Sequence, residues 1–205
     1  MGLREIKSAR TRQRMVGVAV ELFLEQGYDD TTMEQIAESA EAGTTTLYRY
    51  FPTKDLLLLD RLVGGPDLGE RLRDRPSDEP VGEALAAVLR AAAADFDAPD
   101  LRIAEIRQLV DVTPVPRARL WDFHLSARTR LQDALAARMG RAAADLSVRL
   151  TATLALEILT LSDDHRRTRD HPTSHSAAIE DVLAGLPDAE LVLPSGAAAR
   201  AEPVP

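Results

Sequence analysis

The stretch of sequence that decides the fold is TMEQIAESAEAGTTTLYRYFPTKDLLL, residues 32–58. In its first part, Thr32 and Gln35 fit a helix-capping box, and the apolar residues that follow recur at helical spacing. A short turn then leads to a second helix at residues 44–51, where Leu47 and Phe51 lie four apart and share one inward face. Two short helices joined by a tight turn are typical of a helix-turn-helix motif.

The second helix of this motif carries polar side chains on another face. Thr45, Tyr48 and Arg49 are spaced by three and four positions, and Thr44 lies beside them. Such a face can contact phosphates and base edges of DNA, and the unpaired amides after the N-cap Gly43 favour a phosphate. We expect these four side chains to face a DNA groove. The side chains expected to hold the flanking phosphates are Thr46, Tyr50 and Lys54.

The segment resembles the DNA-binding domain of the tetracycline-repressor (TetR) family of bacterial regulators. The matching residues are LFLEQGYDDTTMEQIAE (22–38), LYRYF (47–51) and PTKD (52–55), within a resemblance that covers roughly residues 10–60. One position departs from the family pattern, because Glu41 stands where a glycine is common. The turn there often needs a positive φ, and the carboxylate brings a negative charge near the DNA.

Charge is distributed unevenly along the chain. The net charge of all 205 residues is −8, yet residues 1–14 carry five basic side chains against one acidic side chain. The basic end lies just ahead of the helix-turn-helix and is the expected nucleic-acid footprint, whereas the acidic remainder should repel DNA. The alternative for the basic end alone is a solvated tail.

Composition and motifs also exclude several classes of protein. The chain has no cysteine, no apolar run of membrane-spanning length and no secretory signal in its first residues, so we expect a cytoplasmic protein without disulfides. No glycine-rich phosphate loop and no framed nucleophile is present, so we expect neither an enzyme nor a cofactor. The cluster SDDHRRTRDHPTSH (162–175) could be a metal site, but its arginines and Pro172 favour a charged loop, and we expect no metal.

The remaining sequence predicts further helices and no sheet. Residues 1–10 read as a frayed arm and residues 64–80 as irregular or partly helical. The expected helices outside the motif are 11–26, 54–63, 80–95, 100–112, 117–139, 143–164 and 174–184. We therefore predict an all-α protein of about nine helices. Its expected parts are an N-terminal three-helix helix-turn-helix module (1–63), a helical ligand-binding and dimerisation body (64–193) and a disordered tail (194–205).

The helix expected at 143–164 is apolar on two faces, so it must be covered on two sides. It is either a central helix of one body or a helix shared with a second subunit, and the resemblance favours the second, since the last two helices of TetR-family proteins usually form a dimeric four-helix bundle. The interface residues expected in this helix and the next are Leu150, Leu154, Ile158, Leu161, Ile179, Val182, Leu183 and Leu186.

A mixed aromatic and polar cluster lies in the helix expected at 117–139. Trp121, His124 and Arg128 share one helix face, and Phe123 lies beside them. Apolar walls with a few orienting polar groups are typical of a ligand cavity, so these four residues are candidate ligand contacts. A core tryptophan beside an exposed arginine would explain the same pattern.

Taken together, the residues and the resemblance predict a homodimeric, DNA-binding transcriptional regulator. We expect it to be a repressor that releases its operator when an unknown small-molecule effector binds. One alternative is a DNA-binding regulator released by a partner protein, with no small-molecule ligand. A second is a helical enzyme or carrier whose helix-turn-helix is vestigial.

Overall fold

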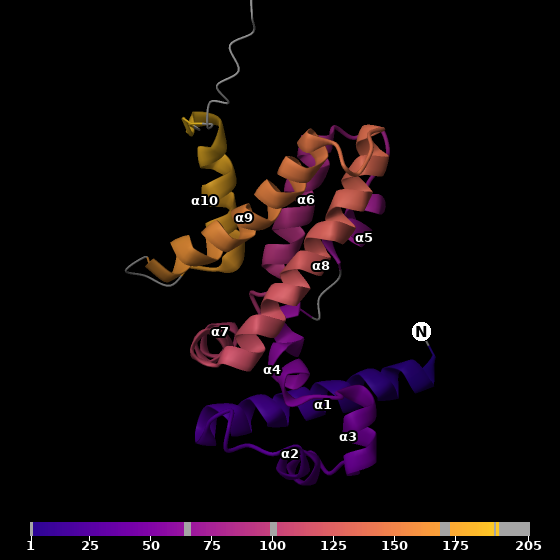
Figure 1. The fold of residues 1–205 in the computed structure, drawn as a ribbon, viewed down its shortest axis with the longest axis vertical. Coiled ribbons are helices and arrows are strands. Elements are labelled where there is room, and N and C mark those ends of the chain that lie inside the picture. The colour runs from indigo at the N-terminus through magenta and orange to yellow at the C-terminus, as the bar shows by residue number, and fades with distance from the viewer. Residues whose placement is uncertain (1, 64–66, 99–101, 169–172, 191, 193–205) are drawn as a thin grey trace, which may run out of the picture.

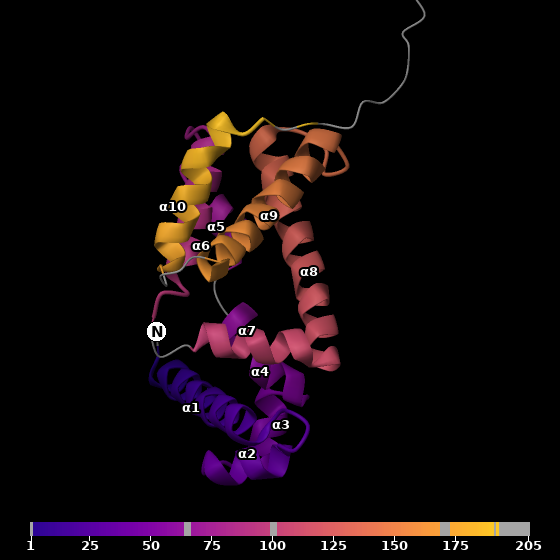
Figure 2. The ribbon, with the colours of Figure 1, turned by 90° about the vertical axis from the view of Figure 1, so that its left-hand side faces the viewer.

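The structure is a computed structural model, and it describes residues 2–63, 67–98, 102–168, 173–190 and 192. These residues form α-helices, a short 3-10 helix and no strand, which confirms the all-α prediction (Figures 1 and 2). In order along the chain, the α-helices are α1 (Leu3–Gln26), α2 (Met33–Ser39), α3 (Thr44–Tyr50), α4 (Lys54–Val63), α5 (Leu68–Arg73), α6 (Val81–Ala94), α7 (Ile103–Val112), α8 (Pro114–Met139), α9 (Leu146–Thr168) and α10 (His175–Gly185). The 3-10 helix η2 is Leu186–Asp188.

Three expected boundaries were wrong. The predicted frayed arm belongs to α1, which begins at Leu3 because residues 3–10 contain no helix breaker and Ser8 is hydrogen-bonded to Tyr50. The segment predicted as irregular contains α5, capped by the Asp67 carboxylate, which accepts from the amides of the next turn. Helix α8 begins at Pro114 because proline is tolerated in the first turn of a helix. The predicted tail at 194–205 lies outside the described residues.

The first three helices pack around a small core at one end of the molecule (Figure 1). The side chains predicted to face inward are buried there, including Ile36, Leu47 and Phe51. Helix α4 rises from this end and contributes Leu57, Leu58 and Leu59, which are all fully buried. Helix α4 is buried on more than one side because it packs against α1 as well as against α7 and α8.

The core of the first four helices extends into α7 and α8. Ile106, Val110 and Leu120 belong to the same buried cluster as the helix-turn-helix side chains. The boundary predicted after residue 63 therefore does not separate two hydrophobic cores. A movement of α7 or α8 would displace α4 directly, because the side chains of all three helices pack in one cluster.

A second core holds the rest of the body together. It is formed by α5, α6, α8, α9 and α10, with Leu89, Leu131, Leu135 and Ile179 among its buried side chains. Helix α8 takes part in both cores, its first turns in one and its later turns in the other. None of the described helices is both long enough and apolar enough to cross a membrane.

Candidate nucleic-acid interface and effector cavity

The helix-turn-helix has a tight turn fixed by local hydrogen bonds. The predicted capping box is present. The backbone N–H of Gln35 donates to Thr32 Oγ1 at 3.2 Å, and the backbone N–H of Thr32 donates to Gln35 Oε1 at 2.8 Å. Glu41 then adopts a φ of 49°, the left-handed conformation for which glycine is usual. Arg14 of α1 lies against it, with Nη1 3.6 Å from the Glu41 carboxylate and Nη2 donating weakly to its carbonyl. Arg14 thus neutralises the one acidic charge in the turn.

The outer face of α3 is open to solvent. Gly43 is the N-cap, and Thr44, Thr45 and Arg49 are exposed, as is 43% of Tyr48. The Tyr48 hydroxyl reaches back to α2 and donates to Glu34 Oε1 at 3.3 Å. The four expected groove-facing side chains therefore lie together on one accessible face. Their contacts with DNA stay predictions.

The side chains expected to hold phosphates differ in how many hydrogen bonds they already make within the protein. Thr46 is half-buried, and the Tyr50 hydroxyl shares a hydrogen bond of 2.8 Å with Ser8 Oγ. The Lys54 ammonium donates to the carbonyl oxygens of Tyr28 (2.5 Å), Thr31 (2.9 Å) and Asp29 (3.3 Å). All three N–H bonds of Lys54 are thus in use within the protein, so a phosphate contact would compete with these bonds.

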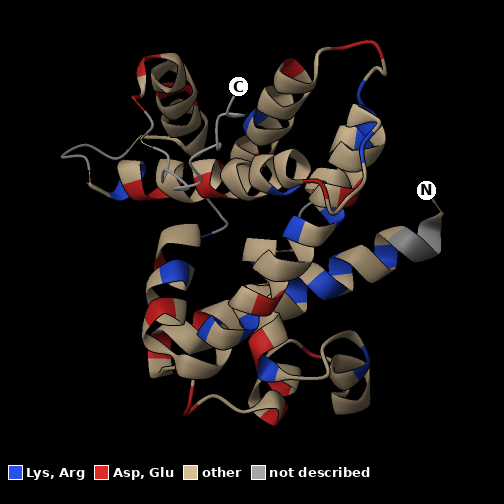
Figure 3. Cartoon of the chain, turned by 45° about the horizontal axis from the view of Figure 1, so that its top comes forward, with Lys and Arg blue, Asp and Glu red and all other residues tan. Residues whose placement is uncertain are grey.

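Basic side chains near this face come from α1 rather than from α3 alone. Figure 3 shows Lys and Arg recurring along the N-terminal half of that helix. Lys7, Arg10 and Arg14 are exposed and spaced by three and four positions, so they share one face. The sequence predicted a basic N-terminal end, but it did not predict that these charges would lie on a helix.

A cavity of about 1180 Å³ lies beside the middle of α8, and its lining includes residues of α1 and α4 as well as of the helical body. All four candidate ligand contacts line it: Trp121, Phe123, His124 and Arg128. The Trp121 and His124 rings meet edge to face at 6.2 Å, and Trp121 is 71% exposed. The alternative of a core tryptophan is therefore wrong for this residue. Whether the four side chains bind a ligand stays a prediction.

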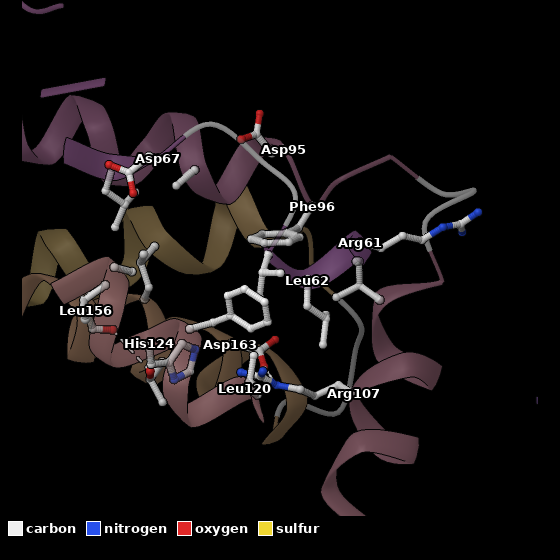
Figure 4. A pocket seen from close by; sticks show the side chains of 18 of the residues that line it. Arg61, Leu62, Asp67, Asp95, Phe96, Arg107, Leu120, His124, Leu156 and Asp163 are labelled. Atoms are coloured by element: carbon white, nitrogen blue, oxygen red, sulfur yellow. Dashed lines mark hydrogen bonds and ion pairs between the residues drawn. The ribbon is translucent and has the colours of Figure 1, made fainter. Parts of the chain in front are cut away.

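A group of charged side chains lies at one end of this cavity (Figure 4). The sequence did not indicate that these side chains would come together. Arg107 of α7 and Asp163 of α9 approach each other there, and His175 of α10 lies within 3.6 Å of Asp163. Burial alone would raise the pKa of Asp163. Hydrogen bonds from His175 and Arg166, with the charges of Arg167 and Arg107, instead hold that pKa well below its usual range. The carboxylate is therefore ionised at neutral pH.

The 162–175 cluster predicted to be a charged loop is mostly helix, because α9 continues to Thr168 and α10 begins at His175. Among the described residues, no group of three acidic, histidine or cysteine side chains is arranged to hold a metal ion. Asp170 and His171 lie outside the described residues.

The expected dimer residues divide into two groups. Ile158 is 5% exposed and Ile179 is fully buried, so both pack inside one subunit and their assignment to a partner-facing surface was wrong. Three leucines of α9 remain about half exposed: Leu150, Leu154 and Leu161. Val182, Leu183 and Leu186 are partly buried against the body core. Ile158 thus lies at the edge of the outward stripe of α9, where the helix turns toward the body core.

Comparison with known proteins finds a family resemblance in the N-terminal part of the chain. Residues 16–60 match the family described as "Bacterial regulatory proteins, tetR family". The chain is 38% identical over 91 residues to the HTH-type transcriptional regulator TcmR of Streptomyces glaucescens, across 44% of this chain and 40% of TcmR. The chain thus spans less than half the length of that curated relative.

Solved structures resemble most of the chain. The repressor NalD of Pseudomonas aeruginosa, described as the secondary repressor of the MexAB-OprM multidrug efflux pump, superposes with a TM-score of 0.55 and 25% identity, over 87% of this chain and 97% of NalD. The regulator FadR of Bacillus subtilis, solved with stearoyl-CoA, gives a TM-score of 0.58 and 18% identity, over 85% of this chain and 96% of FadR. At that identity the second likeness shows the fold alone.

An exposed polar helix after a tight turn, set on a helical body, is the architecture of a helix-turn-helix module joined to a larger helical part. More particularly, residues 16–60 are similar to the DNA-binding region of the tetR family of bacterial regulatory proteins.

Proposed function

We propose that this protein is a homodimeric repressor that binds operator DNA through α3 and releases it when a small molecule enters the body cavity. The observation that carries the proposal is the shared core. Side chains of α7 and α8, two helices that line the cavity, are packed into the same buried cluster as Leu47 and Phe51 of the helix-turn-helix. The 1180 Å³ cavity favours a small-molecule effector over release by a partner protein.

Helix α4 is the element through which we expect the signal to pass. Its last residues, Leu62 and Val63, line the cavity, and its first turn is tied to α8 by an ion pair. Arg119 Nε donates to Asp55 Oδ2 at 3.1 Å, and Asp55 is only 6% exposed. A ligand that prefers one position of α8 would therefore bias the position of α4. Equal affinity for both positions would shift nothing.

DNA recognition is tested by selecting bound fragments of genomic DNA and footprinting them. Replacing the guanidinium in Arg49→Ala should cost on the order of 1–3 kcal/mol if Arg49 contacts a guanine. Tyr48→Phe should weaken all sequences about equally if the hydroxyl holds a phosphate. The matched control is Arg73→Ala, since Arg73 is an exposed arginine on α5, away from α3. Unchanged operator affinity in the Arg49 and Tyr48 double variant would refute the assignment.

Dimerisation is proposed through the exposed leucine stripe of α9, with α10 beside it. A two-fold dimer should bind a near-palindrome whose half-sites are about 34–36 Å apart or a multiple of that spacing. Leu150→Glu with Leu154→Glu should give monomers in light scattering at micromolar concentration and lose tight operator binding. The control Val112→Glu changes an even more exposed apolar side chain outside the stripe and should stay dimeric. A monomeric wild-type protein would contradict the proposal.

A further inference from the structure

The Arg107 guanidinium stands out among the charged groups that line the cavity. Its side chain is only 19% exposed, yet among the described residues it pairs with a single carboxylate, that of Asp163. The separation from Arg107 Nε to Asp163 Oδ2 is 3.8 Å, too long for a hydrogen bond. A guanidinium has five N–H donors, and leaving them without acceptors at a mostly buried position is costly.

Asp163 does not depend on Arg107 for its charge balance. Arg166 Nη2 donates to Asp163 Oδ1 at 3.0 Å, and Arg167 Nε lies 3.4 Å from the other oxygen. His175 Nε2 approaches Asp163 Oδ1 within 3.6 Å. Arg166 and Arg167 both pair with this one carboxylate, so Asp163 compensates the Arg107 charge only in part, and Arg107 lines the cavity.

The surroundings of Arg107 combine apolar walls with one further donor. Leu120, Phe123 and Leu156 line the same cavity, and His124 joins them from α8 (Figure 4). Desolvation, together with the nearby Arg107 charge, lowers the pKa of His124, so its ring is neutral at pH 7 and offers one N–H donor. The cavity therefore has an apolar interior with donors at one end.

We propose that the ligand of this cavity is an apolar molecule with a single carboxylate, and that the carboxylate is held by Arg107 with His124 as a second donor. A carboxylate matches the guanidinium fork with two parallel hydrogen bonds, and its charge replaces the acceptors that Arg107 lacks. Helix α8 supplies His124 and α7 supplies Arg107, so one headgroup would bridge two helices of the shared core. This inference rests on the proposed function, whose effector it specifies.

The number of charges on the ligand is limited by the rest of the lining. Asp122 and Glu157 also line the cavity, and neither has a hydrogen bond or ion pair to another described residue. Their negative charges disfavour a second anionic group on the ligand. Glu157 is close enough to His124 to affect its pKa, so a second anionic group is disfavoured beside this headgroup site.

The experiment compares three probes that share a ten-carbon chain and differ only in the headgroup: decanoate, decanol and decyltrimethylammonium. Each is titrated into the DNA-free protein, with the fluorescence of Trp121, the single tryptophan, as the signal. Decanoate should bind at least about tenfold more tightly than decanol and more tightly still than the ammonium probe. This preference is a property of the headgroup site, because the apolar chain is constant.

Two substitutions then locate the headgroup. Arg107→Met should bring decanoate and decanol to equal affinity, whereas Arg107→Lys should keep part of the preference because the charge remains but the fork is lost. Arg117→Met is the matched control, since Arg117 is an exposed arginine of α8 outside the cavity lining, and it should retain the wild-type preference. Circular dichroism checks that each variant is folded.

Several outcomes would overturn the inference. They are equal affinity for decanoate and decanol in the wild type, tightest binding of the ammonium probe, absence of binding by all three, and an Arg107→Met protein that is folded and keeps the preference. The titration needs no DNA, so its result is independent of operator recognition. Decanoate binding that depends on Arg107 but leaves the operator complex intact would support the ligand class and refute the proposed release.

Discussion

The close crossing of α5 over α8 makes a sharp prediction about Gly69. A Cβ atom at this position would lie 2.6 Å from the Arg130 carbonyl oxygen and 2.9 Å from the carbonyl carbon, well inside the 3.4 Å at which ordinary van der Waals contact begins. The same Cβ would lie 2.9 Å from the Asp67 carboxylate that caps α5. Arg130 Nε also donates to that carboxylate at 2.5 Å. Gly69→Ala must therefore move a backbone or loosen the cap.

The expected cost follows from these contacts. Overpacking against a backbone group costs about 1–3 kcal/mol, and loss of a helix N-cap costs about 1 kcal/mol. Alanine gains up to about 1 kcal/mol over glycine from helix propensity, which offsets part of this. We expect Gly69→Ala to lower the free energy of unfolding by about 1–3 kcal/mol in a urea titration at fixed protein concentration.

A matched control exists in the next helix. Gly82 is the second residue of α6, as Gly69 is the second residue of α5, and a Cβ atom there would meet nothing within 4 Å. Gly82→Ala should be neutral or stabilising by up to about 1 kcal/mol. If Gly69→Ala unfolds at the same urea concentration as Gly82→Ala, α5 does not cross α8 at this distance and the reasoning fails.

Two further predictions concern stability. Asp163→Asn should cost about 3–5 kcal/mol at pH 7, because the mostly buried Arg166 loses its counter-charge. The pKa of Asp163 is held low in the folded protein, so its contribution is present above the unfolded pKa of about 3.9 and fades as pH falls further. Urea titrations at pH 7 and pH 3 should therefore show a smaller difference between wild type and Asp163→Asn at pH 3, and an equal or larger difference there would contradict the assignment. Lys54→Met leaves three loop carbonyls without their donor and should cost about 2 kcal/mol in a thermal melt, whereas Lys7→Met, at an exposed position, should change little.

The helix-turn-helix could be predicted in detail because its signals are local. The capping box at Thr32 and Gln35, the inward pair Leu47 and Phe51, and the positive φ at Glu41 all depend on residues within a few positions of one another. Local spacing also brought the candidate cavity residues of α8 to one place, since residues three and four apart share a helix face.

The features that the sequence did not predict depend on distant contacts. Arg107 and Asp163 are 56 positions apart and meet only because α7 and α9 reach the same end of the cavity. The two apolar faces of α9 were recognised, but which one lies inside is set by the helices packed against it. Ile158 therefore proved to be core, whereas Leu154 stayed exposed. The bonds from Lys54 to backbone carbonyls could not be predicted, because these partners lie more than 20 positions away in the sequence.

The helical start of α1 has an energetic consequence for any polyanion that it meets. A disordered tail would lose about 1–2 kcal/mol of backbone entropy for each residue ordered on contact, whereas a preformed helix has already met that cost in folding. Lys7 and Arg14 are held about 10 Å apart along the helix axis by the 1.5 Å rise per residue. Each phosphate that such a fixed charge neutralises adds about −0.9 to the slope of log K against log salt concentration. The rigid start of α1 therefore converts a run of basic residues into a charge array of fixed spacing, whose contribution can be read from the salt dependence of binding.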